Sequence, residues 1–175
     1  MNGLLVAALM AGIGSTEAIR VGEGHILVWR THALQSGVHR GVTRGYVMVH
    51  GTNRNAEDYF RWALASTAAA DRLDTTAVVA PHFKARTQAG KGDPVEPGEW
   101  YWTNEGWKAG LGALNGAVTS FDAMDRILEC FNDSTRFPDL KEVVVAGHSA
   151  GGQFVQRYAV FNRQEPKMRV HVRYV

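Results

Sequence analysis

A serine framed by glycines is the residue of this 175-residue chain that is best placed to do chemistry. The pentapeptide Gly147-His148-Ser149-Ala150-Gly151 follows the apolar run 143–146 and precedes a helix-compatible segment, 153–159. A serine between a buried strand and a helix must occupy a tight turn, and small residues two positions before and after it let the two backbones pass closely. The pattern therefore predicts a nucleophile elbow with Ser149 as the nucleophile. The alternative is a glycine-rich turn with an incidental serine, and the strand and helix around it favour the elbow.

A second motif lies where such a nucleophile needs hydrogen-bond donors. The short apolar strand pattern 46–49 runs into His50-Gly51-Thr52-Asn53-Arg54-Asn55, and a segment with helical periodicity, 56–70, follows. Acyl transfer places negative charge on the former carbonyl oxygen, and each backbone N–H that stabilises it is worth about 2.7 to 4 kcal/mol. We expect an oxyanion hole formed by the amide of Ala150 and an amide of Thr52 or Asn53. Gly51 then lets the loop backbone approach the substrate, and His50 orients the loop.

Together the two motifs resemble the α/β-hydrolase superfamily, and the string from His50 to Ala56 is similar to loops of its esterase and polyhydroxyalkanoate-depolymerase-like branches. The resemblance covers residues 45–175. It implies a serine hydrolase of the carboxylic-ester type that acts through an acyl-enzyme on Ser149. His50, Gly51, Gly147, His148 and Gly151 would support the nucleophile, with His148 packed beside it.

The partners of the nucleophile are not found where the resemblance implies them. In this superfamily the nucleophile is followed along the chain by the acid and then by the histidine. After Ser149, however, residues 168–175 alternate like a sixth strand, and no loop for either residue follows in the sequence. His171 lies inside that strand and Glu165 on the turn before it, so both are poor candidates for the triad. We therefore expect residues 19–175 to be an incomplete hydrolase domain, with the acid and histidine beyond residue 175. Alone, the chain is expected to turn over esters poorly and to self-associate.

The remaining sequence alternates strand and helix patterns. Residues 19–31 suggest an early hairpin, 75–80 a strand ended by Pro81, and 118–131 a helix with one apolar face. Alternating elements of this kind indicate a mostly parallel sheet with helices on both faces. The predicted fold class is α/β, a three-layer sandwich of the α/β-hydrolase type that ends after about its sixth strand.

The longest irregular stretch, 81–116, contains Trp100, Trp102 and Trp107 among several glycines. Long connections without their own secondary structure are often functional. The three rings either wall a substrate pocket, because aromatic rings give large apolar contact areas, or plug the stretch onto the domain. The sequence leaves both interpretations open.

Composition excludes several other functions. A net charge of +2 without a basic stripe argues against a nucleic-acid partner. His25, His32 and His39 are spaced by seven residues, but their glycine-rich strand context removes a shared helical face, and no H-E-x-x-H motif occurs. We expect no metal and no cofactor. The single cysteine, Cys130, has no partner for an internal disulfide.

The amino-terminal apolar run, 2–14, is too short to span a membrane. Its length and the small-x-small pattern at 16–18 predict a secretory signal over residues 1–18, although no Lys or Arg precedes the run. The alternative is a buried amino-terminal element in a cytoplasmic protein.

Two hypotheses follow from these observations. The first is a serine esterase acting on a small-molecule or polymeric ester, and the second is a noncatalytic ligand-binding protein on the same fold. The sequence fixes neither the acyl group nor the choice between ester and amide, and it does not define the oligomeric state.

Overall fold

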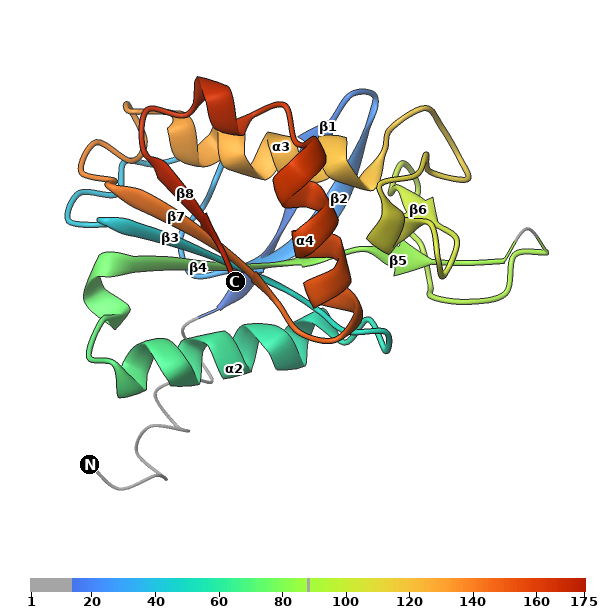
Figure 1. The fold of residues 1–175 in the computed structure, drawn as a ribbon, viewed down its shortest axis with the longest axis horizontal. Helices are drawn as coiled ribbons and strands as arrows, with labels where there is room; N and C mark the ends of the chain where they lie inside the picture. Colours follow the sequence, from blue (N-terminus) through green and yellow to red (C-terminus); the bar gives the residue numbers. More distant parts are fainter. Residues whose placement is uncertain (1–13, 88) are drawn as a thin grey trace.

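The computed structural model describes residues 14–87 and 89–175, which form a six-stranded sheet flanked by helices (Figure 1). The strand order is β1-β2-β4-β3-β7-β8. The β1–β2 hairpin is antiparallel and pairs antiparallel with β4, whereas β4, β3, β7 and β8 are mutually parallel. The strands are β1 (Ser15–Val21), β2 (Gly24–Arg30), β3 (Arg44–Val49), β4 (Thr76–His82), β7 (Glu142–Gly147) and β8 (His171–Tyr174).

Helices cover both faces of the sheet and make three layers (Figure 1). Helix α2 (Ala56–Ala69) packs on one face, and α3 (Ser120–Asn132) and α4 (Ala150–Phe161) pack on the other. Short 3-10 helices η1 (Leu73–Thr75), η2 (Trp107–Ala109) and η3 (Glu165–Lys167) join these elements. The predicted fold class, a three-layer α/β sandwich with a mostly parallel sheet, is confirmed.

Alternation of side chains along the strands sorts the core into two layers. On β3, Val47 and Val49 are fully buried on the side of α3 and α4, while Tyr46 and Met48 pack against the layer under α2. The start of α3 is fixed by a capping box, in which the Thr119 hydroxyl accepts from the Asp122 amide and the Asp122 carboxylate accepts from the Thr119 amide. The predicted helix 118–131 thus corresponds to α3.

Cys130 lies on α3 and is buried in the larger of these two layers. Burial raises the pKa of its thiol to about 11, because the charged thiolate is disfavoured away from water. The thiol is therefore protonated and inert near neutral pH.

Among the predicted boundaries, those of β4 and β8 were wrong. Strand β4 does not end before Pro81 but continues through it to His82, with Pro81 opposite Val28 of β2. Pairing of β4 with β3 stops at Val79, so the strand has a ladder on one side only at this point, where a missing N–H is tolerated. The last strand, β8, begins at His171 and not at Met168, because its ladder with β7 starts where β7 does, at Glu142 opposite His171.

The stretch 81–116 is less irregular than its sequence suggests. Strands β5 (Lys84–Ala85) and β6 (Tyr101–Trp102) form a short parallel pair, and the η2 turn follows. A buried ion pair between Lys84 Nζ and Glu99 Oε2, 2.7 Å apart, ties the two arms of the stretch together.

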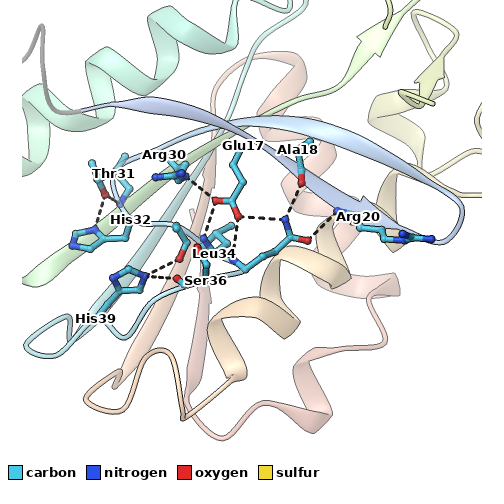
Figure 2. Close-up of polar contacts among 12 residues, drawn as sticks. Glu17, Ala18, Arg20, Arg30, Thr31, His32, Leu34, Ser36 and His39 are labelled. Carbon is cyan, nitrogen blue, oxygen red and sulfur yellow. Dashed lines mark hydrogen bonds and ion pairs between the residues drawn. The ribbon is translucent and has the colours of Figure 1, made fainter. Parts of the chain in front are cut away.

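Strand β1 is anchored to the chain beyond β2 by the Glu17 cluster, which comprises Glu17, Arg30, Leu34 and Gln35. Figure 2 shows Glu17 with Arg30 and Leu34. The Glu17 carboxylate accepts from the Leu34 amide at 2.9 Å and from the Gln35 amide at 3.0 Å, and it pairs with Arg30 Nε at 2.7 Å. Every oxygen of this carboxylate thus has a partner, and its side chain is only 13% exposed. The cluster joins the hairpin to the loop that leads into β3.

The predicted signal boundary at Ala18 falls inside β1. Residues Ser15 to Ala18 pair with β2, so cleavage after Ala18 would remove more than half of this strand together with Glu17. The apolar part of the predicted signal, 2–13, lies outside the described residues. Within 14–87 and 89–175, no helix has the length and apolarity to cross a bilayer.

Candidate active site

The elbow is formed where β7 passes into α4. Ser149 has φ 58° and ψ −119°, a combination that costs a non-glycine residue about 1 to 3 kcal/mol. Its side chain is exposed at the carboxyl end of the strand. No hydrogen bond occupies its hydroxyl within the described part of the chain. The turn therefore presents a free serine hydroxyl to solvent in a strained conformation.

The glycines around Ser149 are required by close backbone contacts. A Cβ at Gly147 would lie 2.3 Å from the Gly151 carbonyl oxygen, and a Cβ at Gly151 would lie 2.3 Å from the Val49 carbonyl oxygen. Real Cβ atoms do not approach backbone this closely, so strand β7, helix α4 and the end of β3 pass one another only because both residues lack side chains.

The second predicted motif lies next to the elbow. Val49 pairs with Gly147 at the last register position of the β3–β7 ladder, so the chain leaves both strands at the same edge of the sheet. A Cβ at Gly51 would meet the Tyr59 hydroxyl at 2.6 Å, which shows how closely the loop packs on α2. Residues Thr52 and Asn53 are exposed. We call His50, Thr52, Asn53, Ser149 and Ala150 the carboxyl-edge site.

Three backbone amides of the carboxyl-edge site are free to act as donors. In 14–87 and 89–175 no acceptor is found for the N–H groups of Thr52, Asn53 and Ala150. Ala150 is the first residue of the 12-residue helix α4, whose amino end carries a partial positive charge. These amides and that charge suit an anionic oxygen.

His50 is buried and both ring nitrogens are used. Nδ1 lies 2.9 Å from the Gly51 carbonyl oxygen, and Nε2 lies 3.0 Å from the Phe83 amide nitrogen. Because the Phe83 amide can only donate, Nε2 accepts and Nδ1 carries the proton that is donated to Gly51. Burial lowers the pKa of His50 to about 3. The imidazole is therefore neutral and holds the loop through its two hydrogen bonds. It has no free nitrogen to act as a base.

His148 is exposed and has a partner that sequence reasoning missed. The Tyr59 hydroxyl lies 3.0 Å from His148 Nδ1, although the two residues are 89 positions apart. This contact links α2 to the residue that precedes the nucleophile. The only advance signal for Tyr59 was its place on the first turns of the predicted helix 56–70.

The two doubtful triad candidates are far from Ser149. His171 pairs with Glu142 at the start of β7, whereas Ser149 follows the end of that strand. Glu165 lies on η3 and accepts a hydrogen bond from the Tyr174 hydroxyl at 2.8 Å. In 14–87 and 89–175 neither side chain is a hydrogen-bond partner of Ser149.

The three tryptophans fill the core. Trp102 and Trp107 are fully buried and Trp100 is 9% exposed. The Trp107 ring packs against His50, with ring centroids 4.7 Å apart, and the Trp100 indole donates to the Val21 carbonyl at 2.9 Å. Of the two interpretations of these residues, the structure favours the second, in which the rings attach the stretch 81–116 to the domain. Trp107 also supports the carboxyl-edge site through its contact with His50.

The rings of His32 and His39 lie edge to face with centroids 5.1 Å apart, so part of the evenly spaced histidine series does come together. No group of three or more His, Cys, Asp or Glu side chains with the geometry to hold a metal is found in the described ranges.

Three polar residues that the sequence did not single out hold the loop after β3. Arg54 Nε lies 2.5 Å from Asp93 Oδ2, Arg54 Nη1 donates to Asn104 Oδ1 at 2.7 Å, and Asp93 Oδ2 also accepts from the Ala85 amide at 2.8 Å. Burial alone would raise the pKa of Asp93, but the hydrogen bonds from Arg54 and Ala85 outweigh it and lower the pKa. Asp93 is therefore ionised at neutral pH.

Comparison with known proteins supports the fold. No protein-family model matches the sequence, and no curated protein matches it. Among solved structures, poly(aspartic acid) hydrolase-1 from Sphingomonas sp. KT-1 matches with a TM-score of 0.52 and 17% identity over 90% of this chain and 53% of its own. XC6422 from Xanthomonas campestris, a lidless α/β serine hydrolase, matches with a TM-score of 0.46 and 13% identity over 85% of this chain and 57% of its own. The siderophore hydrolase EstB from Aspergillus nidulans matches with a TM-score of 0.42 and 17% identity over 82% of this chain and 52% of its own.

The chain shares the fold of poly(aspartic acid) hydrolase-1. It spans about half the length of the structures that it matches. The resemblance drawn from the two motifs therefore holds at the level of fold.

Proposed function

We propose that this chain is the nucleophile-bearing part of a serine hydrolase of the carboxylic-ester type. The single observation that supports this most is Ser149. Its hydroxyl is exposed on a strained turn, and within 14–87 and 89–175 neither this hydroxyl nor the three neighbouring amides have a hydrogen-bond partner. Strain of this kind persists only where the surrounding structure enforces it, and it clusters at functional sites.

The proposed reaction follows from the carboxyl-edge site. The Ser149 Oγ attacks the ester carbonyl carbon and loses its proton to a histidine, while the N–H of Ala150 and that of Thr52 or Asn53 stabilise the oxyanion. Collapse of the tetrahedral intermediate breaks the bond to the alcohol, which takes the proton and leaves an acyl-enzyme. Water then hydrolyses the acyl-enzyme, releasing the acid and restoring the hydroxyl.

We further propose that the histidine and the acid of the triad come from sequence outside these 175 residues. The support is local: both nitrogens of His50 are occupied, Nδ1 of His148 lies against Tyr59, and His171 lies at the other end of the sheet. Without a base, the serine hydroxyl remains a weak nucleophile.

Three proteins test this function: the complete reading frame, the 175-residue chain, and the complete frame with Ser149→Ala. Each is assayed with p-nitrophenyl acetate and a fluorophosphonate probe of reactive serines. We expect Ser149-dependent turnover and labelling of the complete frame only. Robust Ser149-dependent turnover by the 175-residue chain would show that it contains a base after all.

The competing function is noncatalytic binding of a carbonyl ligand, for which the Ser149 hydroxyl would serve as a hydrogen-bond donor. In that case the complete frame would bind carboxylic esters without hydrolysing them. Calorimetric binding without turnover would favour this second function.

We also propose that the protein is exported and that β1 limits where its amino-terminal signal can be cleaved. The strand pairs with β2 from Ser15 onward, so a processed protein that keeps the fold retains Ser15 and Glu17. Amino-terminal sequencing of protein secreted by the native host is expected to find cleavage before Ser15. A mature terminus at Ile19 would contradict this restriction.

A further inference from the structure

The turn that carries two of the free amides is closed by its own backbone. The Arg54 amide donates to the Gly51 carbonyl at 3.1 Å, which makes residues 51–54 a β-turn with Thr52 and Asn53 at its centre. The Gly51 carbonyl also accepts from His50 Nδ1 at 2.9 Å. The first peptide of the turn is therefore held by two donors.

The second peptide of the turn is held by a side chain. Arg54 Nη1 donates to the Thr52 carbonyl oxygen at 2.8 Å. The C=O of Thr52 and the N–H of Asn53 belong to one trans peptide and point in opposite directions. A hydrogen bond that draws the carbonyl towards Arg54 consequently directs the Asn53 N–H away from it.

The guanidinium itself is fixed from the far side. Asp93 pairs with Arg54 through both carboxylate oxygens, at 2.5 Å to Nε and 3.3 Å to Nη2, and Asn104 accepts from Nη1 at 2.7 Å. The side chains of Arg54 and Asp93 are 18% and 19% exposed. A planar group held by a two-point carboxylate contact has a defined orientation, which the single ammonium of a lysine would lack.

Arg54 also adopts an unfavourable backbone conformation, with φ 55°. A left-handed φ is uncommon for a residue with a Cβ and needs compensation from its surroundings. The contacts to Thr52, Asp93 and Asn104 supply that compensation, so the strain and the side-chain network are parts of one arrangement.

We propose that Arg54 is a positioning residue that aims the Asn53 amide, and that Asp93 and Asn104 set the direction of Arg54. This inference rests on the proposed function of the carboxyl-edge site and selects Asn53 as the donor that depends on the stretch 81–116. Contacts made by substrate with that stretch would then act directly on the oxyanion hole.

Kinetics of the complete reading frame provide the first test, with variants Arg54→Lys and Arg54→Gln. Loss of a whole oxyanion donor costs about 100- to 1000-fold in kcat, so a misdirected donor is expected to cost about 10- to 100-fold with KM changed less than about threefold. Lysine should not rescue. Asn104→Ala, which removes one support and leaves the Asp93 contact, should lower kcat by only a few-fold.

A matched control is Arg126→Gln on α3, because Arg126 also donates from a guanidinium to a distant backbone carbonyl, that of Arg20 at 3.3 Å. It should leave kcat and KM unchanged. Added guanidinium ion should partly restore kcat of Arg54→Ala and should do nothing for Arg126→Gln. Arg54 variants with wild-type kcat, or with losses that follow stability and are not rescued, would overturn the proposal.

A measurement that does not depend on enzymatic activity separates this inference from the proposed function. A crystal structure of Arg54→Gln is expected to show the Thr52–Asn53 peptide rotated, with Ser149 unmoved. A wild-type orientation of that peptide would overturn the role of Arg54 even in an active enzyme. If the wild-type frame shows no Ser149-dependent turnover, the proposed function fails. The orientation of the Thr52–Asn53 peptide in the variant still decides whether Arg54 positions Asn53.

Discussion

The Glu17 cluster and the carboxyl-edge site are both polar arrangements that join distant segments of the chain, yet they treat hydrogen-bonding groups in opposite ways. In the cluster both Glu17 oxygens have partners, including two backbone amides and Arg30 (Figure 2). In the carboxyl-edge site, the Ser149 hydroxyl and the amides of Asn53 and Ala150 have no partner in 14–87 and 89–175.

Backbone strain is found at the carboxyl-edge site and at one turn elsewhere. Ser149 and Arg54 have φ of 58° and 55° and belong to or border the carboxyl-edge site, whereas Asp71, with φ 55°, lies in the turn after α2. The comparison teaches that saturated polar groups serve stability, whereas unsaturated groups held in strained turns are kept available for a ligand. Each of the following variants tests one side of this division.

The largest effect is expected for Ser149→Ala in the complete reading frame. Removing the nucleophile should lower kcat at least about 10⁴-fold, because the remaining donors supply only part of the catalysis. The melting temperature should stay close to wild type, since the hydroxyl makes no hydrogen bond within 14–87 and 89–175. Ser134→Ala, at an exposed serine in another turn, is the control for both measurements.

A substitution that adds one carbon to the elbow should damage both function and stability. Gly147→Ala would place a Cβ against the Gly151 carbonyl, a backbone contact that no side-chain movement relieves. We expect unfolding free energy to fall by about 3 kcal/mol in urea titrations. Gly112→Ala is the control, because a Cβ there has no atom within 4 Å. Equal stability of the two variants would mean that the strand and helix do not pass as closely as described.

Glu17→Gln tests the saturated region. The amide keeps the shape of the side chain but loses the charge-assisted hydrogen bonds from the Leu34 and Gln35 amides and the ion pair with Arg30. This loss should cost about 2 kcal/mol of unfolding free energy with kcat unchanged. The matched control is Glu57→Gln, which breaks the exposed Glu57–Arg61 pair on α2 and should cost less than about 0.5 kcal/mol. A loss of kcat in Glu17→Gln would abolish the distinction between the two regions.

Stability should also depend on pH through His50. Its pKa is about 3 in the folded protein and 6.5 as the ordinary value, so the unfolded state binds the proton first. The contribution is complete above pH 6.5 and is lost as pH falls from 6.5 towards 3. At about 1.4 kcal/mol per pH unit, unfolding free energy should be about 2 kcal/mol lower at pH 5 than at pH 7.

Neighbouring charges modify this acid sensitivity, since His82 and Arg54 lower the pKa of His50 whereas Asp93 raises it, and the pKa of His82 is itself lowered by burial. His50→Gln should flatten the dependence more than His82→Gln does, and His171→Gln, at an exposed position, should leave it unchanged. If His50→Gln keeps the full slope between pH 7 and 5, the buried neutral imidazole is not its source.

The smallest expected effect has the opposite sign. Ser149→Gly removes the residue that is strained at φ 58°, so unfolding free energy should rise by about 1 kcal/mol while activity is lost. Comparing Ser149→Gly with Ser149→Ala by differential scanning calorimetry isolates the free energy of backbone strain at this position. A glycine variant less stable than the alanine variant would show that the turn is not strained.

What the sequence predicted depended on how local the signal was. The elbow at Ser149 and the order of strand and helix come from glycine spacing and periodicity within a few residues, and the fold class inferred from them is confirmed. The partners of Arg54 and of His148 lie 39 and 89 positions away, at Asp93 and Tyr59, and no short-range pattern marks them.

Two further features could not be settled without three-dimensional packing. Whether Trp107 walls a pocket or fills the core depends on what the stretch 81–116 packs against, and here it packs against His50. Likewise, the start of β1 at Ser15 follows from its register with β2, because residues 15–18 alone carry no clear strand pattern.

Cys130 gives this chain a built-in probe of global opening. It is the only cysteine of the sequence, and its side chain is buried on the face of α3 that packs against the core. Burial raises the pKa of the thiol to about 11. A thiol reagent can modify it only when the helix layer separates from the sheet, so the labelling rate measures that rare event directly. Changes confined to the turns around Ser149 and Asn53 would leave the rate untouched, and one labelling experiment thus distinguishes local rearrangement from unfolding.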